Sequence, residues 1–382
     1  MKAKENKLEY FVNNQFFRTV LSILLGLVVA GFMLLALNLN PFEAYGAMFK
    51  GVFTNPRNVA ETVIKATPII ITGASVAFAF KTGLFNIGAE GQYMMGFVAA
   101  GVVGILVDFP WFIQIPLLLI AGMLGGLLFG GLAGFLKAKF GVHEVISGIM
   151  LNWIGLYFLN YVALASPLFV QETSGTNPIN VSGQLKLYAA QKAVGDFSGL
   201  SEVPIIGKVL SRSDLNYGII IAVIVAFLLH FIIKKSTLGY QLKSVGFNKD
   251  AAEFAGIDVR KNIIRSMAIA GIIAGLAGAV NIMSLTPHKI NSMAVFENYG
   301  FDGLSVALIA GSSLIGVIPA GLLFSVFKIG GSVLQQQYKV PSEIVSVLIG
   351  IIIFFIAIST ILPVIAQRIA SRKAKEKVWI NY

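Results

Sequence analysis

The sequence has no cysteine, so disulfide bonds and thiolate metal sites are excluded. Charged residues are scarce as well. Asp, Glu, Lys and Arg together make up 12% of the 382 residues, whereas a soluble domain carries roughly 25%. Hydrophobic residues make up 56% of the chain. Water is therefore not the main solvent around this protein.

Signatures of catalysis are missing too. Gly207-Lys208 lacks the earlier glycine of a phosphate-binding loop, and neither a metalloprotease helix nor the spacing of a Ser-based triad is present. His143 has no second His or carboxylate at ligand spacing, which predicts a capping or interfacial role and not a metal site. We expect no catalytic residue, no bound metal and no directly bound cofactor.

Hydrophobic runs of about 20 residues recur along the chain, and each is long enough to cross a hydrocarbon core of about 30 Å as a helix. The roughly 10-residue alternating segments of a membrane β-barrel are absent. The 40 glycines suit helices that pack closely in lipid. We therefore predict an all-α fold, a polytopic membrane helical bundle of about ten transmembrane helices. Their centres are expected near Leu27, Ile71, Phe97, Leu124, Tyr157, Val225, Ile273, Leu308, Phe324 and Ile353.

The net charge of +11 comes from Lys and Arg that gather at the ends of hydrophobic runs. This distribution favours membrane topology over binding to nucleic acid, and the positive-inside rule predicts that both termini are cytoplasmic. The first run, Val20 to Leu37, is interpreted as a retained helix because no clear cleavage site follows it. The predicted organisation is a cytoplasmic tail over 1–18, a transmembrane domain over 19–366 and a basic cytoplasmic tail over 367–382.

Two short stretches recur in the second half of the chain. The run at 125–129 returns in similar form at 320–324, and Glu144-Val-Ile-Ser returns as Glu343-Ile-Val-Ser. The two copies would cross the membrane in opposite directions, which predicts inverted-topology repeats. Such repeats are typical of transporters, with the solute path at the repeat interface; chance recurrence in Leu-rich sequence is the alternative. The repeat halves would span about 59–165 and 262–366.

The stretch from Gly83 to Gln92 is the strongest candidate for a solute path. Three glycines in nine positions disfavour a regular helix, and Asn86, Glu90 and Gln92 bring polar groups beside strongly apolar sequence. An ionisable residue inside a membrane is costly and is by default a functional hypothesis. The amide side chains could bond sugar hydroxyls or base edges, and Phe85 or Tyr93 could stack on a base. Alternatively, Glu90 caps a helix or pairs with a neighbouring span.

Two further residues join this predicted path. Asp302 lies in Tyr299-Gly-Phe-Asp-Gly, a weak echo of Phe85-Asn86 in the second half. Asn152 would face the bundle if Trp153 faces lipid. Structural and functional interpretations of both positions stay open.

Two connections are longer than tight turns. The external one, about 166–216, carries several Pro and Gly and either covers the outer mouth, contacts a partner or is a variable surface loop. The internal one, about 234–262, contains Asn248 and Asp250, which can cap a short helix from Ala251 to Ala255, with Gly256 ending that helix in a left-handed conformation. This internal segment suits contact with another protein; binding to anionic lipid headgroups is the alternative.

At these residues the chain resembles the permease subunits of bacterial ATP-binding-cassette importers, in the branch that includes branched-chain amino acid, ribose and nucleoside permeases. The resemblance runs from about Val59 to Ile365. The stretches Gly83 to Gln92, Val142 to Trp153 and Gly239 to Gly256 resemble the simple-sugar and nucleoside subgroup, because the amino acid subgroup usually lacks the Ala-Glu-Gly-Gln ending of the first stretch.

The resemblance also implies a coupling loop. Asp250-Ala251-Ala252 followed by Gly256 is similar to the acidic-Ala-Ala…Gly core of the importer motif, whereas the usual Ile-x-Leu-Pro is missing after Arg265. The residues that would couple the chain to its ATPase are Gly239, Gly246, Asn248, Asp250, Ala251, Ala252 and Gly256. The implied partners are a cytoplasmic ATPase that uses the ATP, a second homologous permease subunit, an extracellular lipoprotein that binds the substrate, and membrane lipid.

From these features we expect a permease that moves nucleosides or related sugar-containing solutes across the bacterial plasma membrane by alternating access. A branched-chain amino acid or simple-sugar permease is the alternative within the family. An ion-coupled secondary transporter and a non-transporting scaffold are the alternatives outside it. A secondary transporter should carry several buried acidic groups to bind its ion, and here Glu90 is nearly alone.

Overall fold

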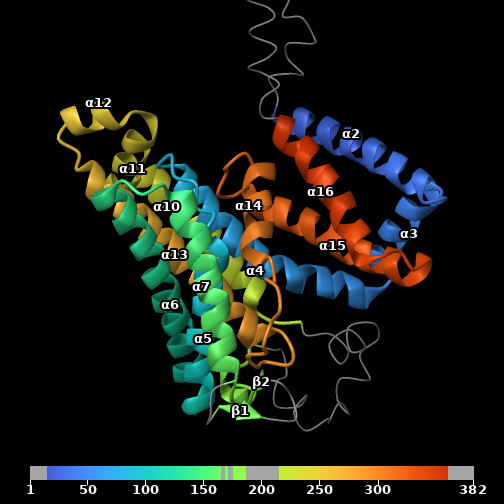
Figure 1. Cartoon of the computed structure of the whole chain (residues 1–382), viewed down its shortest axis with the longest axis horizontal. Coiled ribbons are helices and arrows are strands. Elements are labelled where there is room, and N and C mark those ends of the chain that lie inside the picture. The colour runs from blue at the N-terminus through green and yellow to red at the C-terminus, as the bar shows by residue number, and fades with distance from the viewer. Residues whose placement is uncertain (1–14, 165–167, 171–174, 186–214, 360–382) are drawn as a thin grey trace, which may run out of the picture. The chain divides into compact units, whose positions relative to one another are not determined.

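The computed structural model describes residues 15–164, 168–170, 175–185 and 215–359 (Figure 1). Most of this part is helical. Most of the predicted N-terminal tail, the basic C-terminal tail and much of the predicted external connection lie outside the described residues. The chain forms two compact units, one of residues 1–51 with 327–382 and one of residues 52–326.

The larger unit holds the central bundle. Its helices are α4 (Pro56–Phe80), α5 (Ala89–Leu106), α6 (Trp111–Phe140), α7 (Glu144–Leu164), α10 (Gly218–Lys235), α11 (Thr237–Phe247), α12 (Lys249–Phe254), α13 (Val259–Ser284), α14 (Tyr299–Ile309) and the first part of α15 (Val317–Tyr338). A small antiparallel pair, β1 (Phe169–Val170) and β2 (Gly175–Thr176), and the 3-10 turn η2 (Val181–Gly183) complete it.

The smaller unit contains α2 (Gln15–Ala36), α3 (Pro41–Phe53), the rest of α15 and α16 (Ser342–Ser359). The chain bends by 114° between α2 and α3. Gly26 of α2 lies against the backbone of Ile352 in α16, so these two helices pack closely.

Seven helices in the described part are long and apolar enough to cross a membrane, or eight if the bent pair α2 and α3 forms one span. The prediction of an all-α polytopic bundle is therefore confirmed. Each of the ten predicted centres falls in a helix, but α14 and α16 are shorter apolar helices. The count of ten and the inverted repeats stay predictions. The element order is consistent with a repeat, because 144–147 begins α7 and 343–346 lies in the first turn of α16.

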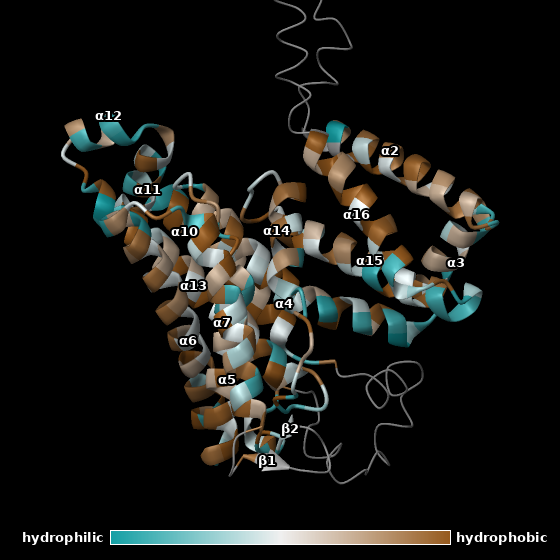
Figure 2. Ribbon diagram, viewed as in Figure 1, coloured by the Kyte–Doolittle hydropathy of each residue, from teal (hydrophilic) through white to brown (hydrophobic). Residues whose placement is uncertain are grey.

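Glycines set the packing of α5, α6 and α13. A Cβ atom built on Gly126 of α6 would lie 2.7 Å from the Cα atom of Gly275 in α13, and Gly96 of α5 meets the same turn of α13. Backbones can approach this closely only where side chains are missing. The outer face of α6, by contrast, exposes Leu124 and Leu128, as expected for a surface in contact with lipid. Figure 2 shows this hydrophobic character along α6 and hydrophilic residues on α12.

Candidate functional site

The segment 81–88 interrupts the helical path between α4 and α5. It forms a turn with Gly83 at φ +69°, followed by irregular backbone up to the start of α5 at Ala89. The break predicted for Gly83 to Gln92 is confirmed up to Gly88, whereas residues 89–92 form the first turn of α5. Leu84 in this segment is buried, so protein surrounds the irregular backbone. Irregular backbone is tolerated at membrane depth only where protein buries it or where it lines a wet cavity.

Asn86 and Gln92 bind each other across the break. The Asn86 amide nitrogen donates to Gln92 Oε1 at 2.8 Å, and the Gln92 amide nitrogen donates to Asn86 Oδ1 at 3.0 Å. Both side chains are buried. The pair ties the first turn of α5 to the irregular segment, and each amide is satisfied by the other.

Asn152 of α7 forms hydrogen bonds with the backbone on both sides of the start of α5. Its Oδ1 accepts from the backbone N–H of Gly91 at 2.7 Å, and its Nδ2 donates to the carbonyl of Ile87 at 3.0 Å. Asn152 is 2% exposed and Trp153 is 45% exposed, which confirms the predicted orientation of this helix.

Glu90 caps α14. Its carboxylate accepts from the backbone N–H groups of Asn298 at 2.9 Å and Gly300 at 2.6 Å, at the first turn of that helix. Gly300 permits the close crossing, because a Cβ atom there would meet the backbone of Glu90. The sequence left two interpretations of Glu90 open, and its geometry is that of a helix cap. A carboxylate at a helix N-terminus satisfies free N–H groups and complements the helix dipole.

The crossing of α5 and α14 lies inside the bundle. The Thr72 hydroxyl of α4 donates to the carbonyl of Tyr299 at 2.8 Å, and Thr72 lies roughly 12 Å along the helix axis from the end of α4. With 11 residues, α14 is roughly 16 Å long, about half of a hydrocarbon core. Two helices, α5 and α14, therefore begin in the interior, next to Glu90.

Phe85 and Asp302, the other two predicted path residues, are half-buried near this crossing. The Phe85 ring lies 5.5 Å from that of Phe80, and Asp302 lies in the first turn of α14. The structure thus brings Asn86, Gln92 and Asn152 to the start of α5, with Phe85 beside them.

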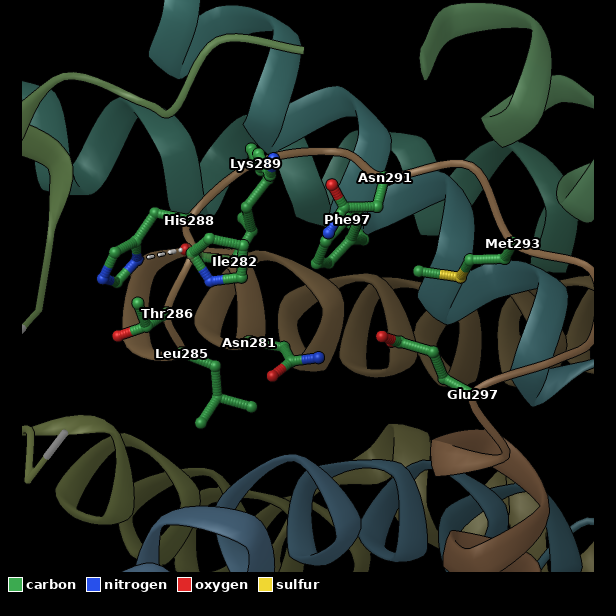
Figure 3. A pocket seen from close by; sticks show the side chains of 11 residues that line it. Phe97, Asn281, Ile282, Leu285, Thr286, His288, Lys289, Asn291, Met293 and Glu297 are labelled. Atoms are coloured by element: carbon green, nitrogen blue, oxygen red, sulfur yellow. Dashed lines mark hydrogen bonds between the residues drawn. The ribbon is translucent and has the colours of Figure 1, made fainter. Parts of the chain in front are cut away.

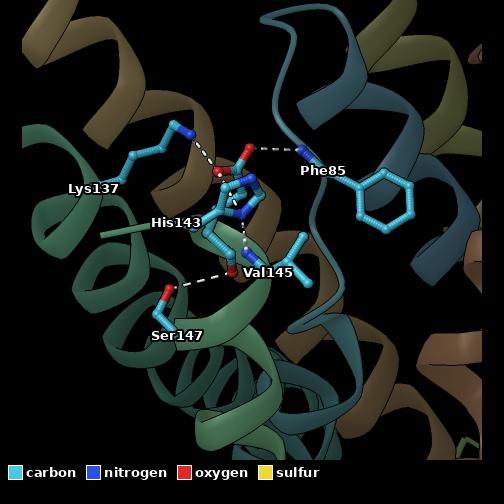
Figure 4. Close-up of polar contacts among 6 residues, drawn as sticks. Phe85, Lys137, His143, Val145 and Ser147 are labelled. Atoms are coloured by element: carbon cyan, nitrogen blue, oxygen red, sulfur yellow. Dashed lines mark hydrogen bonds and ion pairs between the residues drawn. The ribbon is translucent and has the colours of Figure 1, made fainter. Parts of the chain in front are cut away.

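A partly buried ion pair holds the middle of segment 81–88. The Glu144 carboxylate binds Lys137 of α6 and accepts from the backbone N–H of Phe85 at 3.4 Å. Figure 4 shows Lys137 and Phe85 on opposite sides of His143, the residue before Glu144. His143 Nδ1 accepts from the N–H of Val145 at 3.3 Å, as predicted for a capping residue. In the part of the chain described, no group of three His, Cys, Asp or Glu side chains could hold a metal ion.

A second polar network was missed by sequence analysis. The Tyr93 hydroxyl of α5 donates to Glu297 Oε2 at 2.7 Å and accepts from the amide nitrogen of Asn281 in α13. The Tyr93 ring lies 5.4 Å from that of Tyr299, so this network adjoins the crossing at Glu90. A buried amide and an acidic residue in a loop have no local motif, although Asn281 is a rare polar residue within an apolar helix.

A cavity of about 110 Å³ opens beside this network (Figure 3). Its walls come from the last turns of α13, the loop before α14, and α5. The lining residues are Phe97, Asn281, Ile282, Leu285, Thr286, Pro287, His288, Lys289, Asn291, Met293 and Glu297.

The described part of the external connection closes over this end of the bundle. The N–H of Thr176 donates to the carbonyl of Ile290 at 2.9 Å, and the N–H of Ile179 donates to the carbonyl of His288 at 2.8 Å. Thr176 and Ile179 are buried. The residues 175–185 are therefore packed against the loop that lines the cavity.

The predicted internal segment is more helical than expected. Asn248 caps α12 by accepting from the N–H of Ala251 at 3.1 Å, and Gly256 follows the helix with φ +80°, both as predicted. The helix α12 begins at Lys249 and ends at Phe254, so the predicted range was displaced by one or two residues. Asp250 lies in its first turn. The preceding helix α11 was not anticipated.

The glycines of α11 are contact points with the rest of the bundle. Gly239 lies against the backbone of Ile233 in α10, and Gly246 lies against the backbone of Lys81 and Thr82. Burial and the nearby Lys243 lower the pKa of Lys81. The internal segment therefore contacts the beginning of segment 81–88 directly.

Comparison with known proteins gives the family. Residues 58–357 match the family model described as the permease component of branched-chain amino acid transport systems. No solved structure matches the chain at a significant level.

Three curated relatives align over most of their length. The chain is 40% identical to the guanosine ABC transporter permease protein NupP of Bacillus subtilis, over 89% of this chain and 92% of the relative. It is 35% identical to the nucleoside ABC transporter permease protein NupB of Lactococcus lactis, over 94% of each. It is 30% identical to the glucose ABC transporter permease protein TsgB13 of Haloferax volcanii, over 89% and 86%.

Proposed function

Because the chain belongs to the family of branched-chain amino acid transport system permease components, we propose that it is the membrane subunit of an ATP-driven importer for nucleosides. The solute class is inferred from the similarity to permeases named for guanosine and nucleosides, which reaches 40% identity over 89% of the chain. The chain is a multi-pass membrane protein with at least seven membrane-length helices in its described part.

A simple-sugar importer is the second candidate. The glucose permease of Haloferax volcanii aligns over 89% of the chain, at 30% identity. Ribonucleosides and sugars share hydroxyl-bearing rings, so the two candidates differ in whether a base is required. The family description itself names branched-chain amino acids, which have no such ring.

The solute path is proposed to run beside the crossing of α5 and α14. Both helices begin in the interior of the bundle, as the discontinuous helices of transporters do at their binding sites. Polar groups gather there, within an otherwise apolar unit. The proposed path residues are Phe85, Asn86, Glu90, Gln92, Asn152 and Asp302. Because Asn86, Gln92 and Asn152 bind each other or backbone groups, their role is to shape the path and not to leave amides free for solute.

Coupling to the ATPase is proposed to pass through α12. Phe254 at its end is 98% exposed and Phe247, which ends α11, is 91% exposed, and large exposed aromatic groups mark protein contacts. Motion of α12 would reach segment 81–88 through Gly246, which lies against Lys81 and Thr82. ATP would be bound and hydrolysed by the partner, with no cofactor on this chain.

The remaining assignments follow from placing α12 in the cytoplasm. The positive-inside rule places both termini on the same side. The cavity at the opposite end of α13 then faces outward. The proposed complex sits in the cell membrane and contains a second, homologous permease subunit. A lipid-anchored binding protein would deliver the solute outside.

Reconstitution tests the proposal. Proteoliposomes with the two permease subunits, the ATPase and the binding protein should take up radiolabelled guanosine only with ATP inside, and unlabelled glucose or leucine should not compete. Uptake by this chain alone under an ion gradient, without ATPase, would establish a secondary transporter instead. Competition by glucose as strong as by guanosine would favour the sugar importer.

The ATPase contact has a separate test. Phe254→Ala should abolish co-purification of the ATPase while leaving the bundle folded, because this side chain is almost fully exposed. Phe112→Ala is the matched control, since Phe112 is 60% exposed at the start of α6, far along the chain from α12. Equal recovery of ATPase with both variants would exclude α12 as the docking element.

A further inference from the structure

The cavity at the end of α13 is large enough for more than solvent. It measures about 110 Å³, whereas a water molecule needs roughly 10–15 Å³ by the same measure. A pentose-sized group fits this space. Asn281 lies 22 residues after Val259, so the cavity is roughly 33 Å along α13 from the end next to α12.

Hydrogen bonding fixes the orientation of the Asn281 amide. A tyrosine hydroxyl has one proton, and Tyr93 gives it to Glu297 Oε2 at 2.7 Å. The Tyr93 oxygen must therefore accept from Asn281, which places the amide NH₂ of Asn281 toward Tyr93. The amide oxygen then points elsewhere.

This Asn281 oxygen is buried and has no hydrogen-bond partner among the described residues. The residue is 3% exposed and lines the cavity. A buried acceptor without a donor costs about 1–3 kcal/mol. A donor arriving in the cavity would remove that cost, so the site is suited to a ligand that donates.

Glu297 supplies a second acceptor in the same cavity. Figure 3 shows the amide nitrogen of Asn281 on the side of Glu297 and the amide oxygen turned away from it, so the two acceptors lie at different points of the lining. Phe97 and Met293 add apolar surface to the lining. Two acceptors beside an aromatic ring match a pair of neighbouring hydroxyls on a sugar ring, whose carbon face can pack on Phe97.

We propose that this cavity binds the ribose of a nucleoside, with Asn281 Oδ1 and the Glu297 carboxylate accepting from its vicinal 2′- and 3′-hydroxyls. The inference rests on the proposed function and adds a specificity-determining site to it. A 2′-deoxyribonucleoside lacks the hydroxyl assigned to Asn281 and leaves the buried Asn281 Oδ1 unpaired. The permease itself therefore favours ribonucleosides over deoxyribonucleosides.

The test compares uptake of guanosine and 2′-deoxyguanosine by the complete importer in proteoliposomes, with the same binding protein in every arm so that its own preference cancels. Asn281→Ala removes the acceptor and should lower the ratio of guanosine to deoxyguanosine uptake about three- to tenfold relative to wild type, the equivalent of one hydrogen bond. Asn262→Ala is the matched control. Asn262 is on the same helix, is equally buried and also has an unpaired Oδ1, but lies at the other end.

An unchanged ratio in Asn281→Ala, or the same fall in Asn262→Ala, would overturn the site. If Asn281→Ala does not assemble, Glu297→Gln provides the second variant, because it keeps an oxygen for Tyr93 and replaces the other acceptor by a donor. Since Glu297 is assigned to the 3′-hydroxyl, this variant should lower the ratio of guanosine to 3′-deoxyguanosine uptake, and an unchanged ratio would overturn the site. A wild-type complex that transports neither nucleoside would refute the proposed function itself, an outcome distinct from failure of the site.

Discussion

The two sides of α5 contact their neighbours by different physical means. Toward α6 and α13, glycines bring backbones together, with Gly96 against Gly275 and Gly278 against Tyr93 as two of the closest approaches. Toward α14, the contact is made by the Glu90 carboxylate, which accepts hydrogen bonds from two backbone N–H groups. The first contact is dispersive and spread over several turns; the second is polar and concentrated in one side chain.

This difference bears on motion. Close glycine packing loses about a quarter to a half of its dispersion attraction when the gap widens by about 0.5–1 Å, so α5, α6 and α13 are expected to move as one body. A helix cap can be released and remade as a unit. The short helix α14 is therefore the element of this bundle best placed to change position during a transport cycle.

The largest effect is expected from Glu90→Ala. It leaves the N–H groups of Asn298 and Gly300 without their acceptor, at about 1–3 kcal/mol for the buried N–H of Gly300. Thermal unfolding of the purified protein should shift to lower temperature and transport should be lost. Glu61→Ala is the control, because Glu61 is in an exposed pair with Arg57 worth about 0–1 kcal/mol. Equal shifts for both variants would contradict the capping role.

Gly126→Ala should destabilise by about 1–3 kcal/mol, the usual cost of overpacking, since its new methyl group would meet the backbone of α13. Gly131 is on the same helix and has no atom within 4 Å of a built Cβ, so Gly131→Ala should be neutral or stabilising. Unfolding midpoints of the two variants in detergent measure the difference. A destabilised Gly131→Ala would mean that glycine flexibility, not close packing, is what α6 needs.

The pair of Asn86 and Gln92 allows a double-mutant cycle. Asn86→Leu alone leaves the buried Gln92 amide unsatisfied and should cost about 1–3 kcal/mol. Adding Gln92→Leu should recover part of this loss, because an apolar pair leaves no buried polar group behind. Unfolding midpoints of the two single variants and the double variant give the coupling energy. Strictly additive losses would show that the two amides do not depend on each other.

The smallest effect on the bundle is expected from Asn248→Ala, which removes the cap of α12 at a cost of about 1 kcal/mol. The loss is local, so the unfolding midpoint should stay unchanged while the amount of solute moved per ATP falls. Ser236→Ala, which removes the cap of α11, serves as a comparison. A shift of the whole unfolding curve would show that α12 is part of the cooperative core.

Local features were predicted well because their causes are local. The break at 81–88 follows from its glycines, and the helix after Asn248 follows from its cap and from Gly256. The inward orientation of Asn152 follows from its neighbour Trp153. The extra helix α11 was missed because a polar, glycine-containing segment at the membrane surface gives little helical signal by itself.

The sequence by itself determined the solvent of this protein and the type of its elements. Long apolar runs can satisfy their backbone only as helices in lipid, and glycines and caps end those helices at particular residues. The tertiary structure alone decided the partners of the polar groups. Glu90 and Gly300 are far apart in the chain, and so are Tyr93, Asn281 and Glu297. No local pattern specifies such pairs, because they form only when α5, α13 and α14 are packed together.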